Sequence, residues 1–94
     1  MRPQTVCLKP LTARRELEVP ARARALLPFL LKRGLEAGDA WALACNTCLL
    51  HAAWAGGPAA PVQLLDIFSL RQIAALAKAA DELDRELEWE VESR

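Results

Sequence analysis

The chain has 94 residues, which allows one domain with one core and leaves little room for a deep active site. Hydrophobic residues make up 53% of it, and with two Phe, three Trp and no Tyr the apolar mass is Ala and Leu, so a helical fold is expected. The formal net charge is zero, yet eight of the 12 basic residues lie in residues 1–33 and seven of the 12 acidic ones in residues 81–94. The two ends are therefore expected to attract each other, within one chain or between subunits.

Residues 5–11 (TVCLKPL) alternate in character and form the first predicted element, a short strand or extended arm with Val6 and Leu8 on one side. A lone strand leaves its backbone groups unpaired, so it must pair with a further strand of the chain or with another copy of the protein. We therefore divide the single domain into an arm over residues 1–11 and a helical bundle over residues 12–94.

Two helices are predicted next. Thr12 is suited to cap a brief helix over residues 13–18, which Pro20 ends. Pro20 is in turn suited to the first turn of a second helix, which stops at Gly34. Pro28 lies inside this second helix, where it removes a backbone hydrogen bond, so a kink or a break is expected there.

The middle of the sequence is a run of 26 uncharged residues from Ala40 to Leu65. It predicts a helix that begins at Ala40 after an Asp39 cap and ends at Gly56-Gly57-Pro58. Both sides of this helix are apolar, which is typical of a helix at the centre of a bundle. A membrane span is not expected, because the part free of Gly and Pro is about 16 residues long and a span needs about 20.

The last third of the chain is predicted to end in one long helix. Residues 62–68 precede it as a short helical or irregular segment, and Ser69 caps it with Gln72 as its capping-box partner. A stripe with helical spacing is expected to face the core at least as far as Leu83. Its members are Ile73, Ala77, Ala80, Leu83, Asp84, Leu87 and Val91. Trp89 falls on the opposite side, where it is expected to face solvent or a partner.

Cys45, Cys48 and His51, together with Cys7, are the residues that invite a chemical interpretation. On a helix Cys45 and His51 are about 9 Å apart along the axis and about 120° apart around it, too far for joint zinc ligation at about 2.0–2.3 Å. A redox role needs a thiol at a helix N-terminus, whereas Cys45 lies well inside the predicted helix. An odd number of cysteines without a secretory leader indicates free thiols in the cytoplasm. We expect no catalytic residue, metal or cofactor.

Residues 69–77 (SLRQIAALA) are similar to the first helix of a helix-turn-helix unit. A basic second helix does not follow, because the sequence continues into acidic residues between Asp81 and Glu86, which repel phosphate. Nucleic-acid binding is therefore not expected. A small regulatory domain that binds DNA, or a metal ion through the helical Cys and His side chains, is the alternative function.

The phrase Leu8-Lys-Pro-Leu-Thr-Ala-Arg-Arg-Glu-Leu17, after a short strand and before a compact helical domain, resembles the N-terminus of the small tail assembly chaperones of tailed bacteriophages and prophages. The resemblance implies a non-enzymatic protein that coats the hydrophobic tape-measure protein and keeps it soluble until tail-tube subunits polymerise around it. The chain departs from the group in its three cysteines and its charge-free central helix. We accordingly expect a homo-oligomer with a protein partner. The predicted partner contacts are Trp89, Leu87, Val91, Val6 and Leu8.

Overall fold

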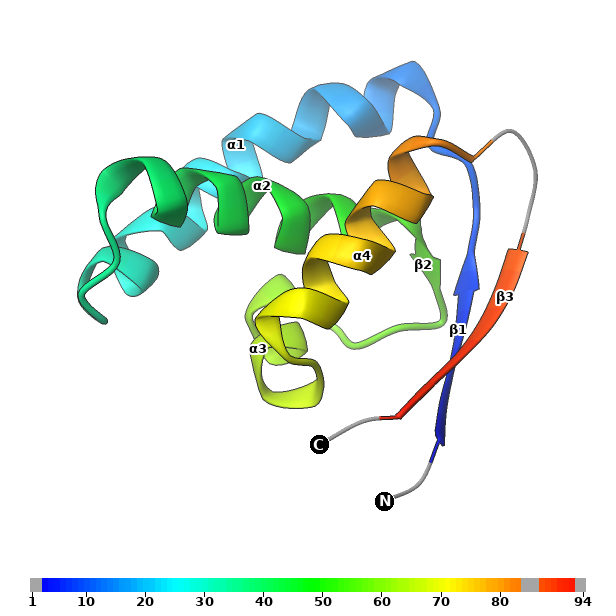
Figure 1. The fold of residues 1–94 in the computed structure, drawn as a ribbon. Helices are drawn as coiled ribbons and strands as arrows, with labels where there is room; N and C mark the ends of the chain where they lie inside the picture. Colours follow the sequence, from blue (N-terminus) through cyan, green and yellow to red (C-terminus); the bar gives the residue numbers. More distant parts are fainter. Residues whose placement is uncertain (1–2, 84–86, 93–94) are drawn as a thin grey trace.

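The computed structural model describes residues 3–83 and 87–92, with residues 3–4 and 87–92 described as backbone. Helices dominate the described chain, and the expected mainly α class with an N-terminal strand is confirmed (Figure 1). In chain order the elements are β1 (Pro3–Leu8), α1 (Ala13–Leu31), α2 (Ala37–Ala53), β2 (Trp54–Ala55), the 3-10 turn η1 (Pro61–Gln63), α3 (Leu64–Ile67), α4 (Leu70–Asp81) and β3 (Leu87–Glu92).

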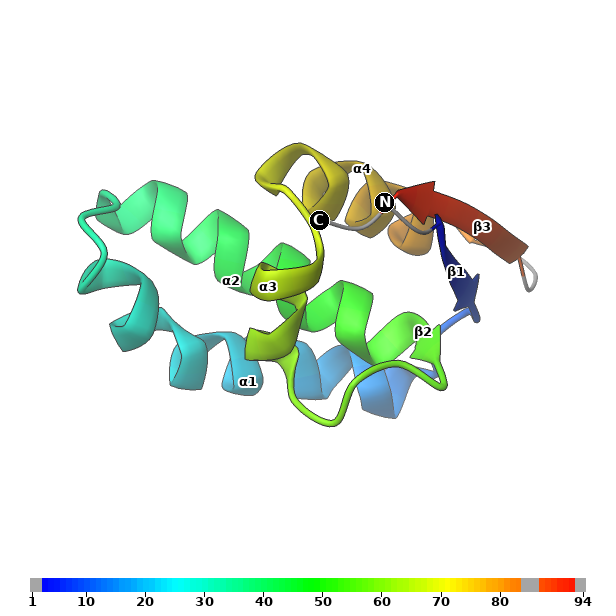
Figure 2. The same ribbon diagram turned by 90° about the horizontal axis from the view of Figure 1, so that it is seen from below.

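A three-stranded antiparallel sheet in the order β2-β1-β3 lies at one end of the helices (Figures 1 and 2). β1 is the central strand, so that Leu8 pairs with Trp54 of β2 on one side and with Leu87 of β3 on the other. The predicted arm is therefore a strand that satisfies its backbone groups within its own chain. Of the two predicted ways of pairing, within one chain or between two, the structure contains the first.

The first helix is one element where two were predicted. Thr12 caps α1 as expected, and its side-chain oxygen accepts a hydrogen bond from the Arg15 amide at 3.4 Å. Pro20 and Pro28 both lie inside α1, so the predicted helix end at Pro20 is wrong. Each proline removes a helical hydrogen bond, but burial of apolar side chains against α2 outweighs the loss and the helix continues. The chain turns at Gly34, whose φ of 88° suits glycine.

The central helix α2 differs from its prediction at both ends. It begins at Ala37, before the predicted start. Asp39 is therefore not the cap but lies in the first turn, where its negative charge interacts favourably with the helix dipole. It ends at Ala53, because Trp54 and Ala55 leave the helix to pair with β1. The tertiary pairing thus shortens a segment whose composition alone favours continued helix.

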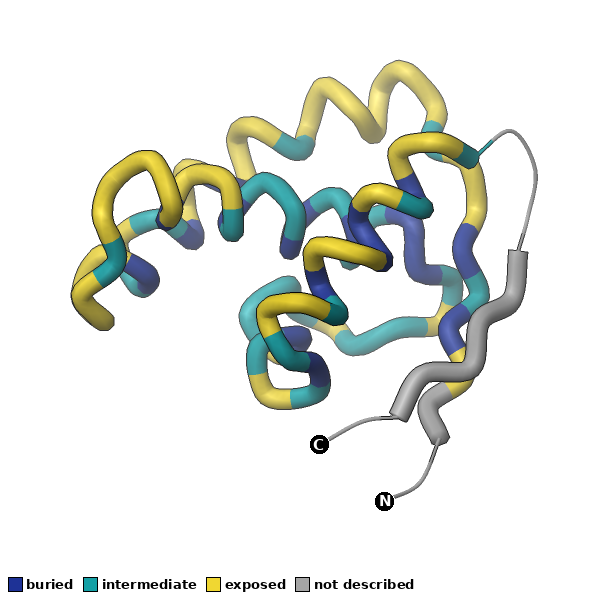
Figure 3. The backbone as a smooth tube through the Cα atoms, viewed as in Figure 1, coloured by how far each residue is buried: buried dark blue, intermediate teal, exposed yellow. Residues whose placement is uncertain are grey.

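The position of α2 at the centre of the molecule matches the prediction. α1 packs on one side of it and α4 on the other, and each contact has its own cluster of buried apolar side chains (Figure 2). The outer side of α1 is exposed along its length (Figure 3). Enclosure of α2 is incomplete near its start, where Trp41 is 37% exposed. Its buried residues are Ala40, Ala44, Thr47, Cys48, Leu50 and Ala53.

The cap of α4 is the one predicted. The Ser69 hydroxyl accepts a hydrogen bond from the Gln72 amide at 3.2 Å, and the Gln72 side-chain oxygen accepts one from the Ser69 amide at 2.9 Å. Ile73, Ala77 and Ala80 of the predicted stripe are buried. The helical spacing was therefore correct for the part of the stripe that lies in α4.

The predicted continuation of this helix is wrong beyond Asp81, where α4 ends, because the chain returns as strand β3. Asp84 of the stripe lies outside the described residues. Within β3, apolar residues alternate with glutamates, which is strand spacing, while Leu87 and Val91 are also four residues apart and so imitate a helical stripe. β1 decides between the two conformations, because its backbone needs a partner strand.

Candidate functional site

Two of the predicted partner contacts, Val6 and Leu8, lie in the core. Their side chains have no exposed surface, and they belong to the same cluster as Leu50 and Ile73. They hold the sheet against α2 and α4. A partner cannot reach them while the sheet is formed.

The other three predicted contacts lie on β3. Leu87, Trp89 and Val91 occupy the register positions opposite Leu8, Val6 and Gln4. The prediction that Trp89 stands opposite Leu87 and Val91 on a helix is wrong, because in a strand all three occupy alternate positions of the same parity.

The cysteines of α2 have thiols of low reactivity. Burial raises the pKa of the Cys48 thiol from 9.0 to about 11; the nearby Cys45 adds to the rise and Arg22 opposes it. Burial also raises the pKa of Cys45. Protonated thiols are poor nucleophiles and poor metal ligands. Within residues 3–83 and 87–92, no group of three or more His, Cys, Asp or Glu side chains is placed to hold a metal ion.

His51 joins the end of α2 to the loop that follows β2. Its Nε2 atom lies 2.8 Å from the carbonyl oxygen of Pro58, and because a carbonyl only accepts, Nε2 carries the proton and donates. Nδ1 is buried and has no hydrogen-bond partner in the described part of the chain. These contacts give His51 a structural part, as a tie across the loop.

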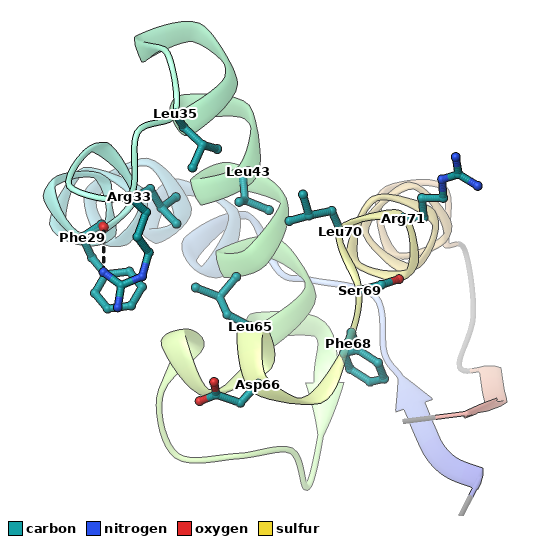
Figure 4. Close-up of a pocket in the computed structure, with 11 residues that line it drawn as sticks. Phe29, Arg33, Leu35, Leu43, Leu65, Asp66, Phe68, Ser69, Leu70 and Arg71 are labelled. Atoms are coloured by element: carbon teal, nitrogen blue, oxygen red, sulfur yellow. Dashed lines mark hydrogen bonds between the residues drawn. The ribbon is translucent and has the colours of Figure 1, made fainter. Parts of the chain in front are cut away.

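The structure also contains a groove that none of the predicted site residues lines. This groove of about 730 Å³ opens between the end of α1, the middle of α2, α3 and the first turn of α4 (Figure 4). Its wall comes from four helices and the loops that adjoin them, so the packing of α1 and α4 on opposite sides of α2 creates it. The apolar part of the wall consists of Phe29, Leu30, Leu35, Leu43, Leu65, Phe68 and Leu70.

Leu70 is the most exposed apolar side chain of this groove. It is 61% exposed at the first position of α4, and it reaches toward Leu43 of α2 (Figure 4). Burial of such a side chain by a partner is worth about 1.5–3 kcal/mol when complete. A single exposed leucine is ordinary on a protein surface, but this one borders a hollow whose other walls are also apolar.

The charged residues of the groove are Arg33, Asp66 and Arg71. The guanidinium carbon of Arg33 lies 3.6 Å from the centre of the Phe29 ring, and its Nη1 donates to the carbonyl oxygen of Phe29 at 3.4 Å. Among the described residues none of the three forms an ion pair. The Arg71 side chain points away from the groove (Figure 4). The groove therefore combines an apolar wall with the guanidinium of Arg33, which has no charged partner in the described part of the chain.

The sequence contains little that could have located this groove. Leu70 lies three residues before Ile73, close to the buried stripe on a helical projection, and would be assigned to the core. Its exposure follows from its place at the helix start, at the border of the groove. Arg33 sits beside the predicted stop at Gly34 and carries no local signal of a site.

Comparison of the chain with protein-family models, with curated proteins and with solved structures finds no match. Among the described residues, no helix has both the length and the apolar character that crossing a membrane requires.

Proposed function

We propose that this chain is a non-enzymatic protein-binding domain that holds an amphipathic helix of a partner protein in the groove between α1, α2, α3 and α4. The observation that carries the proposal is the open, apolar wall, with Leu70 61% exposed at its border. The hollow of about 730 Å³ has the size of a ligand site, and helices that bind in grooves insert two or three apolar side chains spaced by one turn.

The specific form of the proposal is a tail assembly chaperone whose partner is a tape-measure-like protein. Its support is the resemblance over residues 5–20, which in the structure run from β1 into α1, together with an apolar groove suited to varied helices. A chaperone of this kind shields apolar helices without demanding one sequence. Tape-measure and tail-tube genes beside the gene for this chain would favour this form; their absence would leave only the general binding domain.

The binding role is tested with a synthetic amphipathic helix of about 20 residues that carries Leu at positions spaced by three and four. We expect it to bind the wild-type protein, and we expect Leu70→Asp to weaken binding about tenfold or more, because a charge then lies in the apolar wall. Titration calorimetry measures both affinities. An aspartate in the first turn of α4 suits the helix dipole, so this variant should fold.

Leu17→Asp is the matched control, because Leu17 is 79% exposed on α1 and does not line the groove. It should bind the peptide like the wild type. Equal losses in both variants, or no binding of the peptide to the wild type, would contradict the proposal. Salt-sensitive retention on DNA, or one zinc per purified chain, would favour the regulatory domain instead.

Self-association belongs to the proposed chaperone role. Among the described strands β3 pairs only with β1, so its outer edge is the backbone that a second copy could use. The sequence suggested that β1 could pair with another copy of the protein. Its backbone is not available for that contact, because β3 pairs with it over its whole length. Sedimentation velocity over a range of concentrations tests for the oligomer.

A further inference from the structure

We infer that the groove recognises a carboxylate on its partner, and that Arg33 is the residue that binds it. The occupant is then an amphipathic helix with a glutamate or aspartate about one turn from its apolar stripe. The inference rests on the proposed function, since it names the chemistry of the helix that the groove holds.

The first argument is that Arg33 is already held in place. Its guanidinium stacks on the Phe29 ring at 3.6 Å, and one N–H donates to the Phe29 carbonyl oxygen at 3.4 Å. A guanidinium has five N–H donors in a rigid plane, so most of them remain for a ligand. A flexible arginine must lose rotamer freedom when it binds, whereas one stacked on a ring has lost part of it beforehand.

The second argument is that the positive charge of Arg33 is unpaired. The Arg71 side chain points away from the groove, whereas Arg33 lies beside the apolar wall and has no acidic partner among the described residues (Figure 4). Nearby Glu36 forms no ion pair with Arg33. A partner helix with an acidic flank supplies the missing charge, while a basic flank is repelled. The charge of Arg33 then discriminates between partner helices whose apolar side chains fit the wall equally well.

The test uses three synthetic helices that share one leucine stripe and carry Glu, Gln or Lys at the same flanking position. We expect the wild-type protein to bind the Glu helix about three- to tenfold more tightly than the Lys helix, the range for a surface ion pair and its repulsive counterpart. High salt should reduce this preference. Arg33→Glu should reverse it, so that the Lys helix binds more tightly than the Glu helix.

Arg24→Glu is the matched control, because Arg24 is exposed on the same helix and does not line the groove. It should keep the wild-type preference, and circular dichroism should show both variants folded. If all three peptides bind the wild type equally, the carboxylate inference fails and the proposed function stands. If none binds, the proposed function itself fails. An equal shift by Arg24→Glu would assign the preference to overall charge and overturn the role of Arg33.

Discussion

At the scale of single residues, burial decides what the polar groups of α2 can do. Cys48 is 1% exposed, and the cost of desolvating a thiolate keeps its proton bound well above neutral pH. His51 is fixed by the Pro58 carbonyl oxygen. The spacing of Cys45, Cys48 and His51 resembles a set of ligands in the sequence, but in the fold they act as core and as a structural tie.

We predict that Cys48 destabilises the protein only at high pH. Its pKa is raised in the folded state, so its contribution to stability is complete below pH 9 and is lost between pH 9 and about 11, up to about 2–3 kcal/mol. Urea unfolding at several pH values measures this loss. The Cys48→Ala variant should be less stable than the wild type at pH 7, but its free energy of unfolding should fall less steeply above pH 9. A native-state Cys48 that iodoacetamide labels as fast as Cys45 at pH 8 would contradict the assignment.

At the scale of elements, signals within a few residues were predictable and contacts across the chain were not. The caps at Thr12 and at Ser69 with Gln72 are local hydrogen bonds, and the sequence predicted both. The uninterrupted α1 and the strand β3 depend on distant partners, α2 and β1. A residue such as Pro20, which usually begins or ends a helix, was therefore misjudged, because the compensating burial lies on another element.

The buried stripe of α4 gives a prediction at this scale. Ile73 has no exposed surface, so Ile73→Asp places an unpaired charge in the core and should unfold the domain, at a cost of several kcal/mol. Ala74 is exposed on the same helix, and Ala74→Asp should leave the protein folded. Thermal unfolding followed by circular dichroism compares the two. A cooperative wild-type-like transition for Ile73→Asp would show that this face is not core.

At the scale of the whole molecule, the first and last described strands, β1 and β3, lie side by side (Figure 1). Because β1 carries no charged residue, this pairing depends on backbone hydrogen bonds, and it leaves the expected attraction between the basic and acidic ends of the sequence a prediction. The groove, by contrast, arises only when four elements come together, and none of them contains a recognisable motif. That is why none of the partner contacts that the sequence predicts lines this groove.

Self-association should depend on salt if it uses the edge of β3. Glu88, Glu90 and Glu92 take alternate positions of that strand, and an antiparallel pair of such edges brings like charges to neighbouring positions. The oligomer should therefore be stronger at about 0.5 M than at about 0.05 M sodium chloride. Glu90→Gln should shift association to lower salt, while Glu82→Gln, outside the strand, should not. Sedimentation velocity that shows a monomer in all conditions rules out this edge.

The position of β1 at the centre of the sheet has a consequence for biosynthesis. Its main partner strand is the last described element, so during translation Val6 and Leu8 leave the ribosome long before β3 exists. The helices can form from local contacts in the meantime, but the sheet is completed late, and such long-range pairing slows folding. Until then the nascent chain exposes an unpaired segment with apolar side chains, which is the kind of segment that holdase chaperones bind.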